Sequence, residues 1–204
     1  MNNLLKLKKY KIFDNILSLE HQNIIEQLLL SQQFSWYYSE NTSKLDENFE
    51  YRHCLNKNVK EYFQFTHVFF NSDLENLNST KNSNHADIIL NVLDIFKVKN
   101  NLNCIKILRV KANLQTYNKN SSENNYTAPH HDFHNLKHYV LLYYVNDSDG
   151  DTFLFDEKLN IIERITPKKG RFLLFDGDIL HASSTPINTD KRVIINFNLL
   201  ENNE

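Results

Sequence analysis

The chain has 204 residues, of which 41% are hydrophobic and 12% aromatic, so it can form a packed core and is not a largely disordered chain. A formal net charge of −2 argues against bulk binding to nucleic acid, which needs a basic surface. The two cysteines, Cys54 and Cys104, are too few for a disulfide framework, and no apolar run has the length of a membrane span or of a signal peptide. We therefore expect a cytoplasmic protein with no membrane partner.

The N-terminal half predicts two helices and several strands. Ser18 is a good N-cap, and apolar residues recur at helical spacing from there to about Ser31. A second helical pattern runs over 87–98. A short edge strand and two aromatic strands are expected at 10–13, 34–38 and 62–70. His67 lies among the aromatic residues of the last segment, so we interpret it as structural.

From Cys104 onward, short apolar or alternating segments are separated by turn residues, a pattern typical of β-strands. The predicted strands are 104–117, 127–133, 138–145, 151–155, 160–165, 171–175, 178–183 and 192–199. Short strands that follow helices predict a two-sheet jelly roll with the N-terminal helices packed on one sheet. We assign the α+β class, mainly β, and expect one domain over 1–204. In this domain, residues 1–103 support a β-rich core at 104–200.

The pattern that indicates chemistry is His130-His131-Asp132. On a strand, residues two apart face the same side, so His130 and Asp132 can contact one ion while His131 points away. Two histidines and a carboxylate on one face form the ligand set of non-haem Fe(II) oxygenases, and His181 is the third ligand that we predict. Both histidines must be neutral to bind a metal, so binding should weaken at acid pH. His134 has the same parity but follows the expected end of the strand.

In the order of its motifs, the second half resembles the 2-oxoglutarate- and Fe(II)-dependent dioxygenases, in the branch of the prolyl 4-hydroxylases. The motifs that carry the resemblance are His130-x-Asp132, Tyr143 to Asn146, Gly150 to Thr152, Pro167 to Gly170, and His181 with Arg192. The resemblance covers roughly residues 105–200 and implies a double-stranded β-helix core. Segments 34–38 and 65–67 are also similar to small oxygenases encoded by bacteriophages, which would place the protein in the host cytoplasm.

The resemblance also implies how 2-oxoglutarate would be held. Arg192, which follows His181 and opens the last strand, corresponds to the cation that binds the far carboxylate of this cosubstrate. A guanidinium suits this task because it grips a carboxylate through two parallel hydrogen bonds. Tyr144 corresponds to a hydroxyl partner of the same carboxylate, Thr152 to a pocket wall, and Tyr117 to a tyrosine near the keto acid. Each of these last three could instead be an ordinary core residue.

The activity implied by the resemblance is hydroxylation of an organic substrate by Fe(II), 2-oxoglutarate and O₂, with ascorbate as reductant and release of succinate and CO₂. A prolyl residue in a peptide or protein is the favoured substrate. The alternatives are a nucleic-acid or small-molecule oxygenase on the same scaffold, and a non-catalytic cupin-type jelly roll that binds a metal or a sugar. We expect the loops 41–60, 71–86 and 118–127 to determine substrate specificity, but they contain no motif that identifies the substrate. The sequence also does not indicate the oligomeric state.

Overall fold

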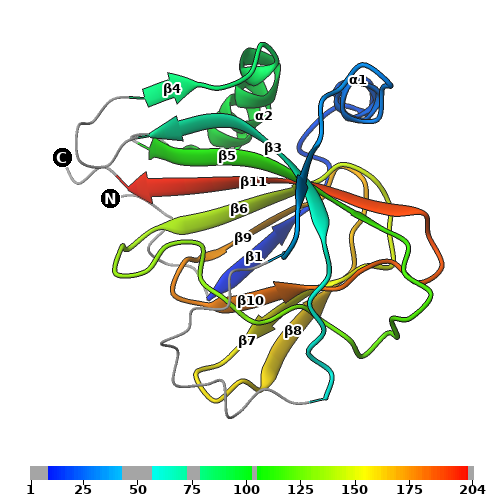
Figure 1. Ribbon diagram of the computed structural model, residues 1–204. Coiled ribbons are helices and arrows are strands. Elements are labelled where there is room, and N and C mark those ends of the chain that lie inside the picture. Colours follow the sequence, from blue (N-terminus) through cyan, green and yellow to red (C-terminus); the bar gives the residue numbers. More distant parts are fainter. Residues whose placement is uncertain (1–8, 43–56, 73–78, 103–104, 202–204) are drawn as a thin grey trace.

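The computed structural model describes residues 9–42, 57–72, 79–102 and 105–201 (Figure 1). The two helices in these ranges are α1 (Leu19–Leu29) and α2 (Ala86–Lys99). The strands are β1 (Tyr10–Phe13), β2 (Tyr37–Ser39), β3 (Gln64–Ser72), β4 (Ser79–Lys81), β5 (Ile105–Thr116), β6 (Tyr139–Tyr144), β7 (Thr152–Phe155), β8 (Ile161–Ile165), β9 (Phe172–Asp176), β10 (Leu180–Ser183) and β11 (Lys191–Glu201).

The strands form two antiparallel sheets. The large sheet has the order β1-β9-β6-β11-β5-β3-β2, with β4 paired to β3, and the small sheet has the order β10-β7-β8. A single backbone bridge joins His130 to His181 of β10 and so adds the segment before β6 to the small sheet. From β5 onward the chain passes back and forth between the two sheets, which is a double-stranded β-helix. The predicted class, α+β and mainly β, is thereby confirmed.

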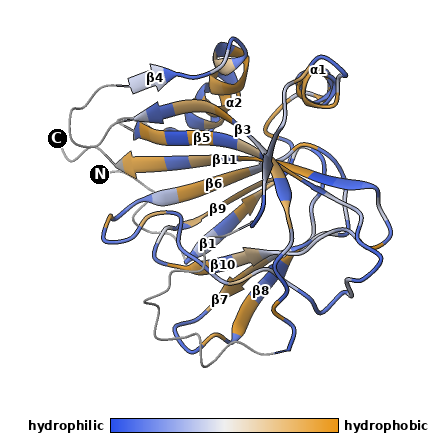
Figure 2. Ribbon diagram, viewed as in Figure 1, coloured by the Kyte–Doolittle hydropathy of each residue, from blue (hydrophilic) through white to orange (hydrophobic). Residues whose placement is uncertain are grey.

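Both helices pack on one face of the large sheet. Leu29 of α1 and Phe96 of α2 belong to the same buried cluster as Tyr143 of β6, and Figure 2 shows apolar stretches on both helices and on the strands of this sheet. Ser18 caps α1 by accepting a hydrogen bond from the backbone N–H of His21 at 3.3 Å. Neither described helix has the length and apolar character needed to span a membrane.

Strand β6 divides the core into two parts. Leu141 and Tyr143 point toward the helices, whereas Leu142 and Tyr144 belong to a second cluster between the two sheets. Successive side chains of a strand face opposite sides, which separates Tyr143 from Tyr144. Tyr144 is fully buried and lies on the side where the small sheet covers the large one.

The inner face of the large sheet becomes polar at β5 and β11. In β5, Val110 and Ala112 point toward the helices, so the alternating residues turn to the small sheet. The inward residues of the two strands include Arg109, Lys111, Asn113, Gln115, Arg192, Asn196 and Asn198. We call these residues the polar stripe. Buried polar groups need hydrogen-bond partners, so apolar packing alone does not account for this part of the interior.

The expected strand over 127–133 is wrong in extent, because only His130 forms a bridge in this segment. The N–H of Ala128, which would be the next donor toward β10, donates to the side chain of Glu61 instead. His67 lies as expected among aromatic residues: its Nδ1 is 2.7 Å from the carbonyl oxygen of Ser35, and its ring centroid is 4.5 Å from that of Phe34.

Other sequence expectations fall only partly within the described ranges. Strand β4 lies inside the expected loop over 71–86. Both cysteines, most of the loop over 41–60 and residues 73–78 lie outside the described residues.

We predict that α2 and the β-rich core unfold together. Phe96 is fully buried, and its ring centroid lies 5.0 Å from that of Phe13 in β1 and 4.8 Å from that of Phe172 in β9. Phe96→Ala should therefore lower the free energy of unfolding by about 3–5 kcal/mol. Val98→Ala, at a position of the same helix that is 77% exposed, is the matched control and should change it by less than about 0.5 kcal/mol.

Urea unfolding followed by circular dichroism and by tyrosine and tryptophan fluorescence measures both effects. The two probes should give one coincident transition, as a single domain over 1–204 requires. Separate transitions, or a Phe96→Ala variant as stable as the Val98→Ala variant, would contradict this coupling.

Candidate active site

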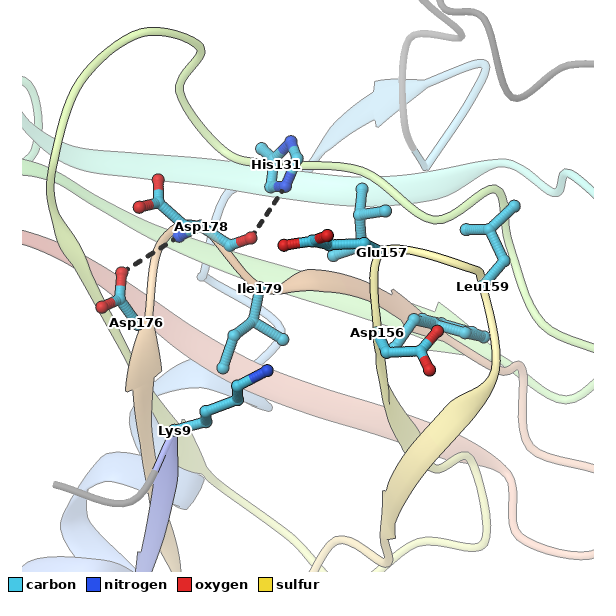
Figure 3. Close-up of a pocket in the computed structure, with 10 residues that line it drawn as sticks. Lys9, His131, Asp156, Glu157, Leu159, Asp176, Asp178 and Ile179 are labelled. Atoms are coloured by element: carbon cyan, nitrogen blue, oxygen red, sulfur yellow. Dashed lines mark hydrogen bonds between the residues drawn. The ribbon is translucent and has the colours of Figure 1, made fainter.

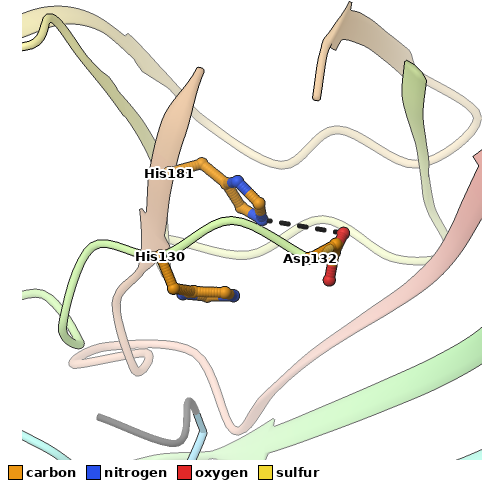
Figure 4. A group of neighbouring side chains, drawn as sticks. All are labelled: His130, Asp132 and His181. Carbon is orange, nitrogen blue, oxygen red and sulfur yellow. Dashed lines mark ion pairs between the residues drawn. The ribbon is translucent and has the colours of Figure 1, made fainter. Parts of the chain in front are cut away.

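The backbone bridge between the two sheet segments brings the predicted ligand residues together. The N–H of His130 donates to the carbonyl of His181 at 3.0 Å, and the N–H of His181 donates back at 3.1 Å. Because the residues face each other in register, the two rings lie on the same side, with centroids 4.5 Å apart. Asp132 points toward them, and one ligand atom from each of the three residues lies within 4.8 Å of the other two (Figure 4).

Hydrogen bonds fix which nitrogen of each histidine faces the group. Nδ1 of His130 lies 3.1 Å from the carbonyl oxygen of Ala128, and Nδ1 of His181 lies 3.4 Å from that of Ile179. Since a carbonyl can only accept, Nδ1 carries the proton and the Nε2 lone pair is left for a metal. Nε2 of His181 is 3.9 Å from Oδ2 of Asp132.

The charge state of the histidines also suits metal binding. Burial lowers the pKa of His181 to about 3 and lowers the pKa of His130 as well. Both imidazoles are therefore neutral at physiological pH, which is the form that binds a metal ion.

Asp132 is held ionised by a network from the polar stripe. Its Oδ1 accepts a hydrogen bond from Arg109 at 2.8 Å, and its Oδ2 accepts one each from Asn196 and Asn198, also at 2.8 Å. Burial by itself would raise the pKa of this carboxyl, but the charge of Arg109, with smaller effects from the two histidines, holds the pKa well below its usual range. The carboxylate is therefore charged and fixed in orientation.

Sequence reasoning did not identify these three supporting residues. The signal that could have found them is the alternation of polar residues in strands whose other face is apolar, over 109–115 and 192–198. The alternation does not show which of these residues form hydrogen bonds with one another. That pairing depends on the register that sets Asn198 opposite Arg109 and Asn196 opposite Lys111.

Arg192 lies in the same interior and is only 2% exposed. Its guanidinium donates to the carbonyl of Gly150 at 2.7 Å, to the side-chain oxygen of Gln115 at 3.1 Å and to the hydroxyl of Thr152 at 2.8 Å. The Tyr144 hydroxyl donates to the same Thr152 oxygen at 2.8 Å. The three partners of Arg192 are formally neutral, and no ion pair joins Arg192 to a carboxylate among the described residues.

Asp151 acts on Arg192 only at a distance and is paired with Arg164, and a buried cation with no ion pair of its own is costly, so Arg192 favours a ligand that carries a negative group. It shares a cleft between the two sheets with all three residues of the candidate metal site. This cleft is lined by Thr42, Lys111, Asn113, His130, Asp132, Leu142, Thr152, His181, Ala182, Ser183, Arg192, Ile194 and Asn196. The donor set thus fits a divalent metal, and the far end of the cleft fits a carboxylate.

Tyr117 is not in the cleft. Its side chain is 52% exposed and lines a separate surface pocket with Tyr62 and Phe63. The chain turns outward after Thr116, where β5 ends, so Gln115 rather than Tyr117 is the last side chain of this strand to reach the interior. The structure therefore brings together six of the seven predicted site residues and leaves Tyr117 outside.

A larger pocket of about 470 Å³ lies next to the candidate metal site but does not include it (Figure 3). Its lining is Lys9, His131, Phe155, Asp156, Glu157, Leu159, Asp176, Asp178, Ile179 and Leu180. His131 points into this pocket, with Nε2 3.1 Å from the carbonyl oxygen of Asp178. The pocket has no residue in common with the cleft, so its size does not make it the site of metal chemistry.

Comparison with known proteins supports this assignment of the cleft. Residues 112–200 match the family model described as the 2OG-Fe(II) oxygenase superfamily. The matched segment contains His130, Asp132, His181 and Arg192. Among curated proteins, none matches the sequence.

Solved structures share the fold at low sequence identity. An oxidoreductase of the 2OG-Fe(II) oxygenase family from Burkholderia pseudomallei has a TM-score of 0.70 and 10% identity, with 96% of this chain and 86% of that chain covered. A Trichoplax adhaerens prolyl hydroxylase, in complex with a hypoxia inducible factor peptide fragment, has a TM-score of 0.63 and 15% identity, with 98% and 86% covered.

A third structure is the epimerase SnoN in complex with Fe³⁺, α-ketoglutarate and nogalamycin RO. It has a TM-score of 0.60 and 10% identity, with 96% of this chain and 80% of that chain covered. The family match over residues 112–200, the double-stranded β-helix and the buried His-Asp-His group agree, so this segment is similar to the 2OG-Fe(II) oxygenase superfamily, and the fold is similar to that of a prolyl hydroxylase.

Proposed function

We propose that this enzyme is an Fe(II)- and 2-oxoglutarate-dependent dioxygenase that hydroxylates an organic substrate and releases succinate and CO₂. The observation that carries the proposal is the pairing, in one cleft, of the candidate metal triad with a buried Arg192 whose side-chain partners are all neutral. A cupin-type binding protein would not need such a cation. We also propose that residues 1–204 act as one domain.

His130, Asp132 and His181 would be the three protein ligands of Fe(II). Their neutral Nε2 atoms and the fixed carboxylate would take one face of the ion and leave its other positions for cosubstrate and oxygen. Bound Fe(II) supplies the oxidising chemistry with O₂ and 2-oxoglutarate, and we assign ascorbate the role of external reductant. Arg109, Asn196 and Asn198 would hold the carboxylate in place and keep it ionised.

Arg192 would bind the far carboxylate of 2-oxoglutarate. The NH2 group of Arg192 and the Tyr144 hydroxyl both donate to the Thr152 oxygen, so the two donors lie close together beside this lining residue of the cleft. Burial raises the pKa of Tyr144 to about 12, which keeps its hydroxyl protonated and able to donate. A carboxylate at this point would supply the negative charge that Arg192 lacks.

For the substrate we favour a prolyl residue in a peptide or protein, since the fold is similar to that of a prolyl hydroxylase in complex with a peptide. A small-molecule substrate is the second candidate, because the similar epimerase SnoN is in complex with nogalamycin RO. Both choices rest on fold similarity, and the active-site residues must decide between them.

We predict that His181→Ala weakens Mn(II) binding, measured by calorimetric titration, by at least about a hundredfold. Removal of groups that merely support metal ligands costs about 10–100-fold, and loss of a ligand should cost at least as much. His131→Ala is the matched control, because His131 points into the neighbouring pocket and should not affect the metal. Equal Mn(II) affinity in the His181→Ala variant and the parent protein would remove His181 from the ligand set.

We predict that Arg192→Met weakens 2-oxoglutarate binding to the Mn(II)-loaded protein by about ten- to a hundredfold, as expected for loss of a hydrogen bond to a charged group. Metal affinity should change little. Tyr144→Phe should have a smaller effect, because a neutral donor contributes about half as much. Arg171→Met, which removes a surface ion pair with Asp14, is the control and should bind 2-oxoglutarate normally. Normal binding by the Arg192→Met variant would exclude Arg192 as the anchor.

The activity itself is tested by turnover without a prime substrate. The purified protein with Fe(II), O₂ and 2-oxoglutarate should release succinate slowly, and the His181→Ala variant should release none above the level of free iron. If the parent protein neither binds 2-oxoglutarate nor forms succinate, the cupin-type alternative is favoured instead.

A further inference from the structure

Lys111 is a second cation in the cleft, and the metal and cosubstrate roles do not use it. It lies on the inner face of β5 and lines the cleft together with the three residues of the metal site. Burial lowers its pKa to about 8, with a further contribution from nearby Arg109, which leaves the amine mostly protonated at neutral pH. Over the described part of the chain, its ammonium makes no hydrogen bond or ion pair.

Asp132, the acid whose charge acts on Lys111, already has hydrogen-bond partners on both of its oxygens. Asp132 contributes a favourable charge interaction, but its two oxygens accept hydrogen bonds from Arg109, Asn196 and Asn198. Asp132 is also the carboxylate that would bind the metal. Lys111 is therefore near the metal site without a partner of its own, and a structural ion pair does not explain it.

The neighbour of Lys111 on the same face is also free to bind a ligand. Asn113 lines the cleft and forms no side-chain hydrogen bond among the described residues, so its Nδ2 can donate to a ligand oxygen. The unused polar groups thus lie side by side on β5. Buried polar atoms in native proteins are nearly always satisfied, so this pair indicates that a polar ligand group completes the cleft.

The strand register separates this pair from the cosubstrate anchor. Gln115 lies opposite Arg192, and Lys111 lies opposite Asn196, four residues further along the sheet. At about 3.3 Å per residue, the two backbone positions are roughly 13 Å apart. Lys111 therefore lies level with Asn196, which holds the carboxylate of Asp132, whereas Arg192 lies further along the strand pair.

The balance of charges in the cleft also indicates that Lys111 is not needed by the metal site or by 2-oxoglutarate. Asp132 is balanced by Arg109, and the far carboxylate of 2-oxoglutarate would be balanced by Arg192. The near carboxylate would face a divalent metal ion. After the metal and the cosubstrate are bound, Lys111 still lacks a negative partner, and only the prime substrate remains to supply one.

We propose that Lys111 and Asn113 form a subsite for a carboxylate group of the prime substrate, next to the metal centre. This inference rests on the proposed function and narrows its substrate class to acids, with the carboxylate close to the carbon that is oxidised. The carboxylate can belong to the chain end of the substrate or to an acidic side chain. Lys111 is in this view a specificity residue and takes no part in oxygen chemistry.

The test measures where small probes bind in the protein loaded with Mn(II) and saturating 2-oxoglutarate. Bound Mn(II) speeds the relaxation of proton signals from molecules that bind beside it, so the effect reports both binding and proximity to the metal without turnover. Three acid and amide pairs are compared: acetate with acetamide, N-acetylproline with N-acetylprolinamide, and N-acetyl-Pro-Glu-amide with N-acetyl-Pro-Gln-amide. The last two pairs distinguish a terminal carboxylate from a side-chain carboxylate.

In the parent protein, at least one acid should show about tenfold or more relaxation enhancement over its amide, as expected for a charge-assisted hydrogen bond. Lys111→Met should abolish this preference, and Lys111→Arg should restore most of it. Lys158→Met, at an exposed lysine outside the cleft, is the matched control and should behave as the parent protein.

Two results would overturn the subsite. One is equal enhancement by acid and amide in all three pairs, which would leave Lys111 as a counter-charge for Asp132. The other is a Lys111→Met variant whose 2-oxoglutarate affinity falls by about tenfold or more, because Lys111 would then belong to the cosubstrate. Failure of the proposed function is visible separately, since the parent protein would not take up Mn(II) and 2-oxoglutarate before any probe is added.

Discussion

The active-site geometry depends on one backbone bridge between His130 and His181. These residues are distant in sequence, and the reciprocal N–H···O bonds between them fix the relative position of their Cα atoms. The second hydrogen bond of each histidine, from Nδ1 to a nearby carbonyl, then fixes the ring orientation. Because the carbonyl acceptors belong to residues two positions earlier, each histidine carries its own orienting group. The metal-binding geometry is therefore largely set by the backbone.

The rest of the site is built on the polar half of the large sheet. Strands β6 and β9 present apolar side chains to the interior, such as Leu142 and Leu173, whereas β5 and β11 present amides and cations. The polar residues partner one another across the register, as in the contact of Arg109 with Asn198 at 3.1 Å. Such a network is costly when incomplete, which explains why it is restricted to the strands beside the candidate metal site.

Much of this arrangement could be predicted from local sequence patterns, and the rest required the strand register. The two-residue spacing of His130 and Asp132 predicted that they lie near each other, and the alternation of a strand accounts for the interior position of Tyr144 in β6. The strand expected at 127–133 was reduced to a single bridge because the N–H of Ala128, the next donor toward β10, goes to the side chain of Glu61. Tyr117 was misplaced since the end of β5 cannot be read from composition. The network around Asp132 joins residues far apart in sequence, so no local pattern contains it.

The cleft concentrates positive charge before any ligand binds. Lys111 and Arg192 line it, Arg109 contacts Asp132 from beside it, and Asp132 is the one acid among the described residues that line the cleft. These cations repel a divalent metal, whereas a dianionic cosubstrate offsets their charge. Metal and 2-oxoglutarate should therefore favour each other's binding, and by linkage the effect is equal in both directions. Lys111 is the cation that neither Asp132 nor the cosubstrate would neutralise, so its charge stays available to an acidic group of the substrate.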